Sequence, residues 1–107
     1  MREPVSQPLL MENNMGTETK IAFPLGRVVA TPTALETIPP EDVMRALARH
    51  AAGDWGEVDP EDWQENELSV REGFRLMSVY RDRNDVTFWV ITEADRSVTT
   101  LLLPSEY

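Results

Sequence analysis

Residues 74–103 read FRLMSVYRDRNDVTFWVITEADRSVTTLLL, and apolar side chains alternate with polar ones along much of this segment. A period of two, together with many β-branched and aromatic residues, is typical of strands. We therefore predict strands over Phe74–Arg81, Val86–Thr92 and Val98–Leu103. Because both connections are short and rich in turn-forming residues, consecutive strands should pair antiparallel as a meander.

Two helices are predicted before this meander. Apolar residues recur at helical spacing over Glu41–Ala52, which predicts a buried stripe of Val43, Met44, Leu47, Ala48 and Ala51 and an exposed opposite face that includes Asp42. A second helix is expected to begin after Asp59, which is a good N-cap and is followed by Pro60, and to end at Gly73. A short strand at Arg27–Thr31 precedes both helices. The predicted fold class is α+β, with a three- or four-stranded antiparallel sheet packed on one face against two main helices.

The length of 107 residues suits one domain. Residues 1–20 are rich in Glu, Asn, Gln, Pro and Thr and show no periodicity, so we predict a disordered tail there. Met11 and Met15 are alternative start positions under this interpretation. Residues 21–107 are predicted to form a single α+β domain.

The composition argues against several kinds of site. Cysteine is absent, which excludes disulfides, thiolate metal ligands and cysteine nucleophiles. One histidine is too few for a tetrahedral zinc site, and the acidic residues do not follow the order of a calcium loop. No phosphate loop or dinucleotide fingerprint is found, so we predict neither a metal nor a cofactor. Without a secretory signal or a membrane-spanning run, a cytoplasmic location is expected.

The charge is strongly acidic and uneven. The chain carries 19 acidic and 10 basic residues, a net charge of −9. Between Gly53 and Glu67 there are seven acidic residues and no basic one. Nucleic acids and anionic membranes attract clustered Lys and Arg, so direct binding to either is disfavoured. A basic protein surface is the partner that this charge favours.

The segment His50–Glu57 brings an imidazole, two carboxylates and an indole close together in sequence. One interpretation is a small pocket in which Trp55 stacks on a ligand and His50 or Asp54 transfers a proton. The alternative is structural: a helix end followed by a tight turn, with Trp55 anchoring the loop in the core.

The segment Thr92–Ser97 is the second candidate. Glu93, Asp95 and Arg96 at a hairpin tip could contact a partner or a substrate. Equally, Asp95 could bond the turn backbone while Arg96 pairs with a neighbouring acid.

Glu67 falls on the predicted apolar stripe of the second helix, between Trp63 and Val70. The structural interpretation is an i,i+4 pair with Arg71 at the rim of the core. If Glu67 were buried instead, its pKa would rise and a catalytic acid would become conceivable.

Short motifs occur in order along the chain: FPLGRVVATP at 23–32, GDWG at 53–56, ITEADRS at 91–97, and LLP at 102–104 with the closing Glu106-Tyr107. In this combination the chain resembles a family of small bacterial proteins carried on plasmids, integrative elements and some phages. Some members are labelled plasmid-related proteins or are loosely attached to type I restriction–modification subunits. The resemblance spans about residues 23–107 and implies no particular activity.

The leading hypothesis is a small acidic, cytoplasmic binding or accessory protein of a mobile element, which inhibits a basic nucleic-acid-binding host protein. The predicted partner-binding residues are Asp54, Trp55, Glu57, Asp59, Glu61, Asp62, Glu65 and Arg96. The first alternative is a small hydrolase or acid/base enzyme using His50 and Asp54 with Glu93 or Asp95. The second is a homodimer that pairs through an open sheet edge or exposed aromatic side chains.

Overall fold

The computed structural model describes residues 21–107, so the tail predicted for residues 1–20 lies outside the described part of the chain. The elements are, in order, β1 (Arg27–Ala30), α1 (Pro32–Thr37), α2 (Pro40–Ala51), α3 (Pro60–Glu72), β2 (Leu76–Arg81), β3 (Thr87–Thr92), β4 (Val98–Leu102) and a 3-10 turn, η1 (Pro104–Glu106). The predicted α+β class is confirmed. The two main helices, α2 and α3, and the three strands of the meander begin and end within two residues of the predicted positions.

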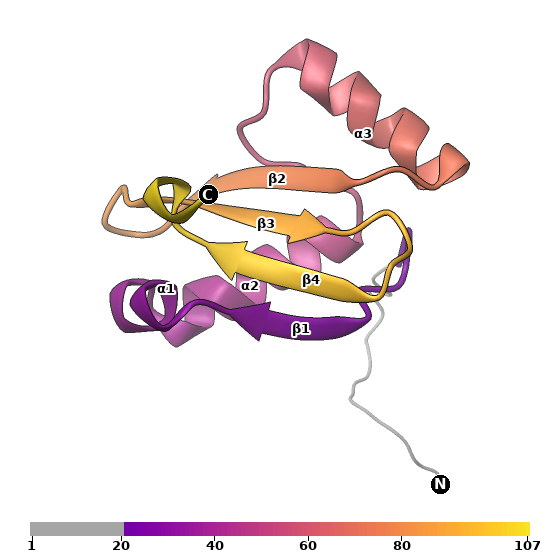
Figure 1. Ribbon diagram of the computed structural model, residues 1–107. Coiled ribbons are helices and arrows are strands. Elements are labelled where there is room, and N and C mark those ends of the chain that lie inside the picture. Colours follow the sequence, from indigo (N-terminus) through magenta and orange to yellow (C-terminus); the bar gives the residue numbers. More distant parts are fainter. Residues whose placement is uncertain (1–20) are drawn as a thin grey trace, which may run out of the picture.

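The four strands form one sheet in the order β1-β4-β3-β2 (Figure 1). The pairs β2–β3 and β3–β4 are antiparallel, which confirms the predicted meander. Strand β1 pairs parallel with β4, with Arg27 opposite Val98, so the sheet is mixed and not wholly antiparallel. The reason is topological: β1 and β4 are far apart in sequence, and no tight turn forces an antiparallel direction on them.

Helix α2 packs across one face of the sheet, whereas α3 lies alongside β2 at the sheet edge (Figure 1). Trp63 and Val70 of α3 pack against Leu76, which points to the same face of β2 as Tyr80 of the α2 core, so both main helices lie toward the predicted face, with α3 at its β2 edge. The main core joins α1 and α2 to the strand residues that point toward them. Its buried members are Ala34, Ile38, Val43, Ala46, Tyr80, Phe88, Val90 and Leu101.

The buried side of α2 differs from the predicted stripe. Met44 was expected in the core but is 66% exposed, and Asp42 was expected in solvent but is buried. Val43, Ala46 and His50 form the inward side instead. Asp42 is tolerated there because arginines satisfy its carboxylate, as described below.

A second, smaller core lies between α3 and the sheet. Trp55 is fully buried, and its indole ring stacks on Phe23 with ring centroids 5.9 Å apart. Leu76 completes the buried part of this cluster. On α3, Trp63 and Val70 pack against it, as the heptad spacing of these two residues predicted.

Two sets of hydrogen bonds cover the outer edge of β2. Gly56 forms a parallel bridge with Val79, in which the amides of Glu57 and Val79 donate to Val79 O and Trp55 O at 2.7 and 3.1 Å. A Cβ on Gly56 would lie 2.0 Å from Val79 O, so only glycine fits. Two residues earlier in β2, the Asn66 side chain donates to Met77 O at 2.8 Å and accepts from Met77 N at 3.2 Å.

Candidate functional site

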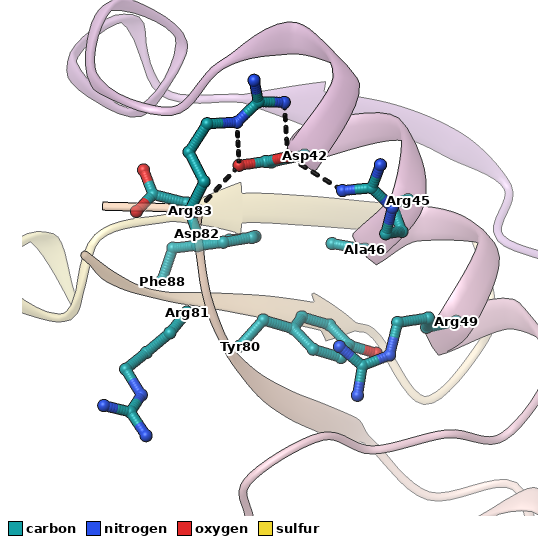
Figure 2. A pocket seen from close by; sticks show the side chains of 9 residues that line it. All are labelled: Asp42, Arg45, Ala46, Arg49, Tyr80, Arg81, Asp82, Arg83 and Phe88. Carbon is teal, nitrogen blue, oxygen red and sulfur yellow. Dashed lines mark hydrogen bonds and ion pairs between the residues drawn. The ribbon is translucent and has the colours of Figure 1, made fainter. Parts of the chain in front are cut away.

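A hollow opens between α2 and the end of the sheet where β2 turns into β3, and four arginines surround it (Figure 2). Two arginines come from α2, one from the end of β2 and one from the turn. The floor is formed by the rings of Tyr80 and Phe88, both almost fully buried. The lining residues are Asp42, Arg45, Ala46, Arg49, Tyr80, Arg81, Asp82, Arg83 and Phe88.

Asp42 organises one side of this hollow. Its carboxylate accepts hydrogen bonds from Arg83 Nε, Arg83 Nη2 and the Arg83 amide at 3.1, 2.9 and 3.0 Å. Arg45 Nη1 donates a further bond at 3.0 Å. The hydrogen bonds from Arg83 hold the pKa of Asp42 well below its usual range. Because the Arg83 amide belongs to the β2–β3 turn, Asp42 also fixes this turn to α2.

Arg49 and Asp54 form the opposite side. Arg49 donates from Nε and Nη2 to the two carboxylate oxygens of Asp54, at 2.8 and 3.2 Å. This bidentate pair lowers the pKa of Asp54. The guanidinium also lies over the Tyr80 ring, 4.7 Å from its centroid. The Tyr80 hydroxyl donates to Asp54 O at 2.6 Å, and burial raises the pKa of Tyr80.

His50, the proposed proton carrier, lies in the core with no exposed surface. Its Nδ1 is 2.6 Å from Ser78 Oγ, and its Nε2 is 2.9 Å from Thr92 Oγ1. This series of hydrogen bonds continues from Thr92 Oγ1 to Thr99 Oγ1 at 2.7 Å, and Thr99 donates to Leu25 O at 2.6 Å. Burial lowers the pKa of His50 to about 4, with a smaller contribution from the charge of Arg96.

The carbonyl at the end of this chain fixes the direction of every hydrogen bond in it. Leu25 O can only accept, so the Thr99 hydroxyl donates to it and must accept from Thr92. Thr92 therefore accepts from His50 Nε2–H, and the Ser78 hydroxyl donates to His50 Nδ1. His50 is held as the neutral Nε2–H tautomer, with no ring nitrogen left for a substrate.

The polar side chains of the hairpin between β3 and β4 are engaged in hydrogen bonds within the fold. Asp95 Oδ1 accepts from the Ser97 amide at 3.0 Å, which confirms the predicted turn bond. Among residues 21–107, Arg96 forms no ion pair with an acidic side chain. Its Nη1 donates to Phe74 O and Glu93 O at 2.7 and 3.1 Å, and its Nη2 donates to Ser69 O at 2.8 Å. Arg96 thus closes the carboxyl end of α3 and is removed from the predicted partner surface.

The four candidate acid/base residues do not share a site. His50 is enclosed in the core, and Asp54 is turned toward Arg49. Glu93 pairs with Arg75 at 3.5 Å, and Asp95 binds its own turn. A general acid or base must reach the proton that it transfers, so this arrangement gives no support to proton transfer.

The acidic residues of the loop before α3 have internal partners. Arg81 Nε donates to both oxygens of Glu57, at 3.0 and 3.1 Å. Asp59 Oδ1 accepts from the Asp62 amide at 2.8 Å and caps α3, as predicted. Together with the Arg49–Asp54 pair, these bonds neutralise or engage the loop part of the predicted acidic surface.

Two further sequence-based expectations are corrected near α3. Trp55 is fully buried and donates from Nε1 to Glu67 Oε2 at 3.0 Å, so it cannot contact a partner. Glu67 is exposed and does not form the predicted ion pair with Arg71. Its place on the apolar stripe is explained by the indole N–H, which requires an acceptor at the rim of the core.

The outer face of α3 keeps its negative charge. Glu61, Asp62 and Glu65 line a shallow groove together with Gln64 and Leu68. Within residues 21–107 these three carboxylates make no ion pair and accept no hydrogen bond.

In the described part of the chain, no helix combines the length and apolar character that crossing a membrane requires. Within the same residues, no group of three His, Asp or Glu side chains is placed to hold a metal ion. No family model, curated protein or solved structure matches this chain. The resemblance to proteins of mobile elements therefore stays a prediction from the motifs.

The arginine-lined hollow was not found from the sequence. Arg45 and Arg49 are one helical turn apart, and that spacing was visible in the sequence. Arg81 and Arg83, however, reach the same place only because the β2–β3 turn folds back onto α2. The convergence of these four arginines was hidden by an acidic sequence in which no basic cluster stands out.

Proposed function

We propose that this protein is a small acidic binding protein without catalytic activity, which docks on a basic protein surface through the outer face of α3. The observation that carries the proposal is the set of three carboxylates, Glu61, Asp62 and Glu65, that lack ion-pair partners within residues 21–107. Leu68 lies beside them and is 37% exposed. Charge accelerates the encounter with a basic partner, and an apolar contact supplies binding energy.

The docking face is smaller than the one predicted from the sequence. Asp54 and Glu57 form ion pairs with Arg49 and Arg81, and Asp59 caps α3. What is left is a single helix that stands beside the edge strand, away from the main core (Figure 1). A helix in this position can approach a partner without moving the sheet.

The finer form of the proposal is an accessory protein of a mobile element that acts in the cytoplasm and blocks a nucleic-acid-binding host protein. A row of carboxylates along a helix offers guanidinium and ammonium groups the negative charge that a phosphate backbone also offers. The net charge of −9 and the resemblance to proteins of plasmids and phages support this form.

A homodimer that pairs through the β2 edge is a weaker alternative, which leaves β1 as the other edge strand. Pairing through β2 would require the loss of the bonds that Gly56 and Asn66 make to Val79 and Met77. An acid/base enzyme is weaker still, since His50 has neither exposure nor a free nitrogen.

The proposal is tested by capture from a bacterial lysate with Glu61→Gln/Glu65→Gln as the variant. The matched control is Glu36→Gln/Glu41→Gln, which removes the same charge from α1 and α2. We expect the wild type and the control to retain a basic protein that is released at high salt, because exposed charges are screened over about 10 Å at 0.1 M salt. The α3 variant should lose it. Equal retention by all three proteins would count against α3 as the docking face.

A further inference from the structure

We propose that the arginine-lined hollow between α2 and the β2–β3 turn binds the phosphate group of a small ligand. This site is separate from the acidic face of α3 and does not depend on the proposed function. Four arginines and two aspartates line the hollow, and Asp54 and Glu57 pair with two of these arginines from outside the lining, so the four guanidinium groups face four close carboxylates. What an anion meets in the hollow is therefore a set of unused guanidinium N–H donors and not a surplus of positive charge.

The guanidinium groups are held in place before any ligand arrives. Asp42 holds Arg83 by two side-chain bonds and Arg45 by one. Asp54 holds Arg49 by two bonds, and Glu57 holds Arg81 through its Nε. Restraining these long side chains in advance reduces the entropy that binding would otherwise cost.

Each arginine keeps donors for a ligand. A guanidinium has five N–H groups, and the bonds just described use one on Arg45, two on Arg49, one on Arg81 and two on Arg83. The side chains of Arg45 and Arg49 are 66% and 42% exposed, so the remaining donors are open to solvent. Figure 2 shows Arg45 and Arg83 beside Asp42, with Arg49 lying over Tyr80.

The carboxylates that pair with the arginines, Asp54 and Glu57 included, occupy only part of the guanidinium donors. Asp42 lies beneath the arginines and is itself bonded by Arg83 and Arg45. The outer partners Glu41 and Asp85 are 71% and 85% exposed and pair only at 3.6 and 3.7 Å. Water and salt screen such exposed charges, whereas guanidinium donors in a hollow act at contact distance.

Phosphate fits this arrangement better than a carboxylate does. A phosphate group offers three or more acceptor oxygens and up to two negative charges, so it can engage several planar guanidinium forks together. A long nucleic acid is disfavoured, because the net charge of −9 would repel the rest of its backbone. The inferred ligand class is therefore free phosphate or a small phosphate ester.

The experiment is a titration of the full chain followed by NMR of the arginine Nε–H and backbone amide signals at constant ionic strength. The probes are inorganic phosphate, adenosine monophosphate and sodium chloride. We expect saturable shifts at Arg45, Arg49, Arg81 and Arg83 with phosphate, and none with chloride. Tighter binding of the nucleotide identifies an ester as the preferred source, and equal binding identifies free phosphate. Shifts that grow linearly, or equally with chloride, would overturn the proposal.

The variants are Arg45→Gln and, independently, Arg81→Gln. Both side chains are largely exposed, and Asp42 keeps its bonds from Arg83 in the first variant. Each should weaken phosphate binding about tenfold, the effect of losing one charged hydrogen-bond donor. Arg71→Gln on α3 is the control for the loss of one charge and should bind as the wild type does. Equal weakening in all three variants, or tighter binding of a single-stranded oligonucleotide than of the nucleotide, would contradict a small-ligand site.

Discussion

The single histidine, His50, is enclosed in the core and bonded through both of its ring nitrogens. His50 has no exposed surface, and the chain from Ser78 to Leu25 O is completed by its neutral form. A protonated imidazole has two N–H donors, so Nδ1–H would face the hydroxyl that now donates to it. The phenyl and indole rings of Phe23 and Trp55 pack edge-on against the imidazole and offer no counter-charge.

The first prediction is an acid-dependent loss of stability. The pKa of His50 is about 4 in the folded protein and 6.5 ordinarily, so the unfolded chain binds more protons between these values. The free energy of unfolding should therefore fall as the pH falls from 7 to 4, by about 3 kcal/mol from this group. Urea unfolding at a series of pH values measures the change. NMR titration of the single histidine gives the folded pKa, and a value near 6.5 would remove the basis of the prediction.

The second prediction concerns Asp42. Replacing it by Asn removes the charge that Arg83 and Arg45 contact, while the size of the side chain is kept. We expect the melting temperature at pH 7 to fall by several degrees, because the β2–β3 turn loses its attachment to α2. Glu41→Gln at the exposed neighbouring position should change it little. Since the pKa of Asp42 is lowered from its ordinary value of 3.8 in the folded state, the difference between variant and wild type should be constant at neutral pH and shrink progressively as the pH falls below that value.

Among the secondary-structure elements, β2 shows how an edge strand is protected from pairing with another chain. Gly56 and the Asn66 side chain together satisfy the outward backbone groups of Val79 and Met77. Open edges of this kind pair readily with other chains. One asparagine on a helix thus acts in place of a neighbouring strand at Met77.

The third prediction follows from this contact. Asn66→Ala removes two hydrogen bonds from the Met77 backbone, and unsatisfied groups of this kind cost about 1–3 kcal/mol. Urea unfolding should show this loss, and light scattering should show association through the opened edge. Gln64→Ala, on the exposed side of the same helix, should be close to neutral. A variant that stays monomeric with wild-type stability would show that Asn66 does not protect the edge.

The fourth prediction is that α3 opens before the sheet does. Only Asn66 and Ser69 of α3 are buried, and the helix is held mainly by Trp63, Val70, the Trp55–Glu67 bond and the Arg96 clamp. Regions with few buried apolar contacts open with a lower free energy than the core. Amide hydrogen exchange should therefore be faster in α3 than in β3. Equal protection of both elements would show that they unfold as one unit.

For the molecule as a whole, the sequence predicted the helices and strands better than it predicted which of them pair or pack together. Alternation and helix caps act over a few residues, so the meander, Asp59 and Gly73 were found correctly. The parallel pairing of β1 with β4 and the convergence of four arginines depend on contacts across most of the chain. No local pattern encodes those.

The candidate site was predicted less well for the same reason. The sequence marks Trp55, Asp54 and Arg96 as chemically capable but does not show which groups will satisfy them internally. The Trp55 N–H donates to Glu67, Asp54 pairs with Arg49, and Arg96 donates to four backbone carbonyls. The carboxylates of α3 kept their predicted exposure, and residues 53–67 contain no basic residue that could pair with them.

The pairing of β1 with β4 has a consequence for how the protein is made. Thr99 bonds to Leu25, 74 positions earlier, so the strand that leaves the ribosome first acquires its neighbour only when the last strand has followed. Contacts between such distant positions slow folding, because a large loop must close before they form. During synthesis β1 waits unpaired for several seconds at the usual pace of about 5–20 residues per second. A nascent chain stalled before Val98 should therefore expose that strand to chaperones or proteases.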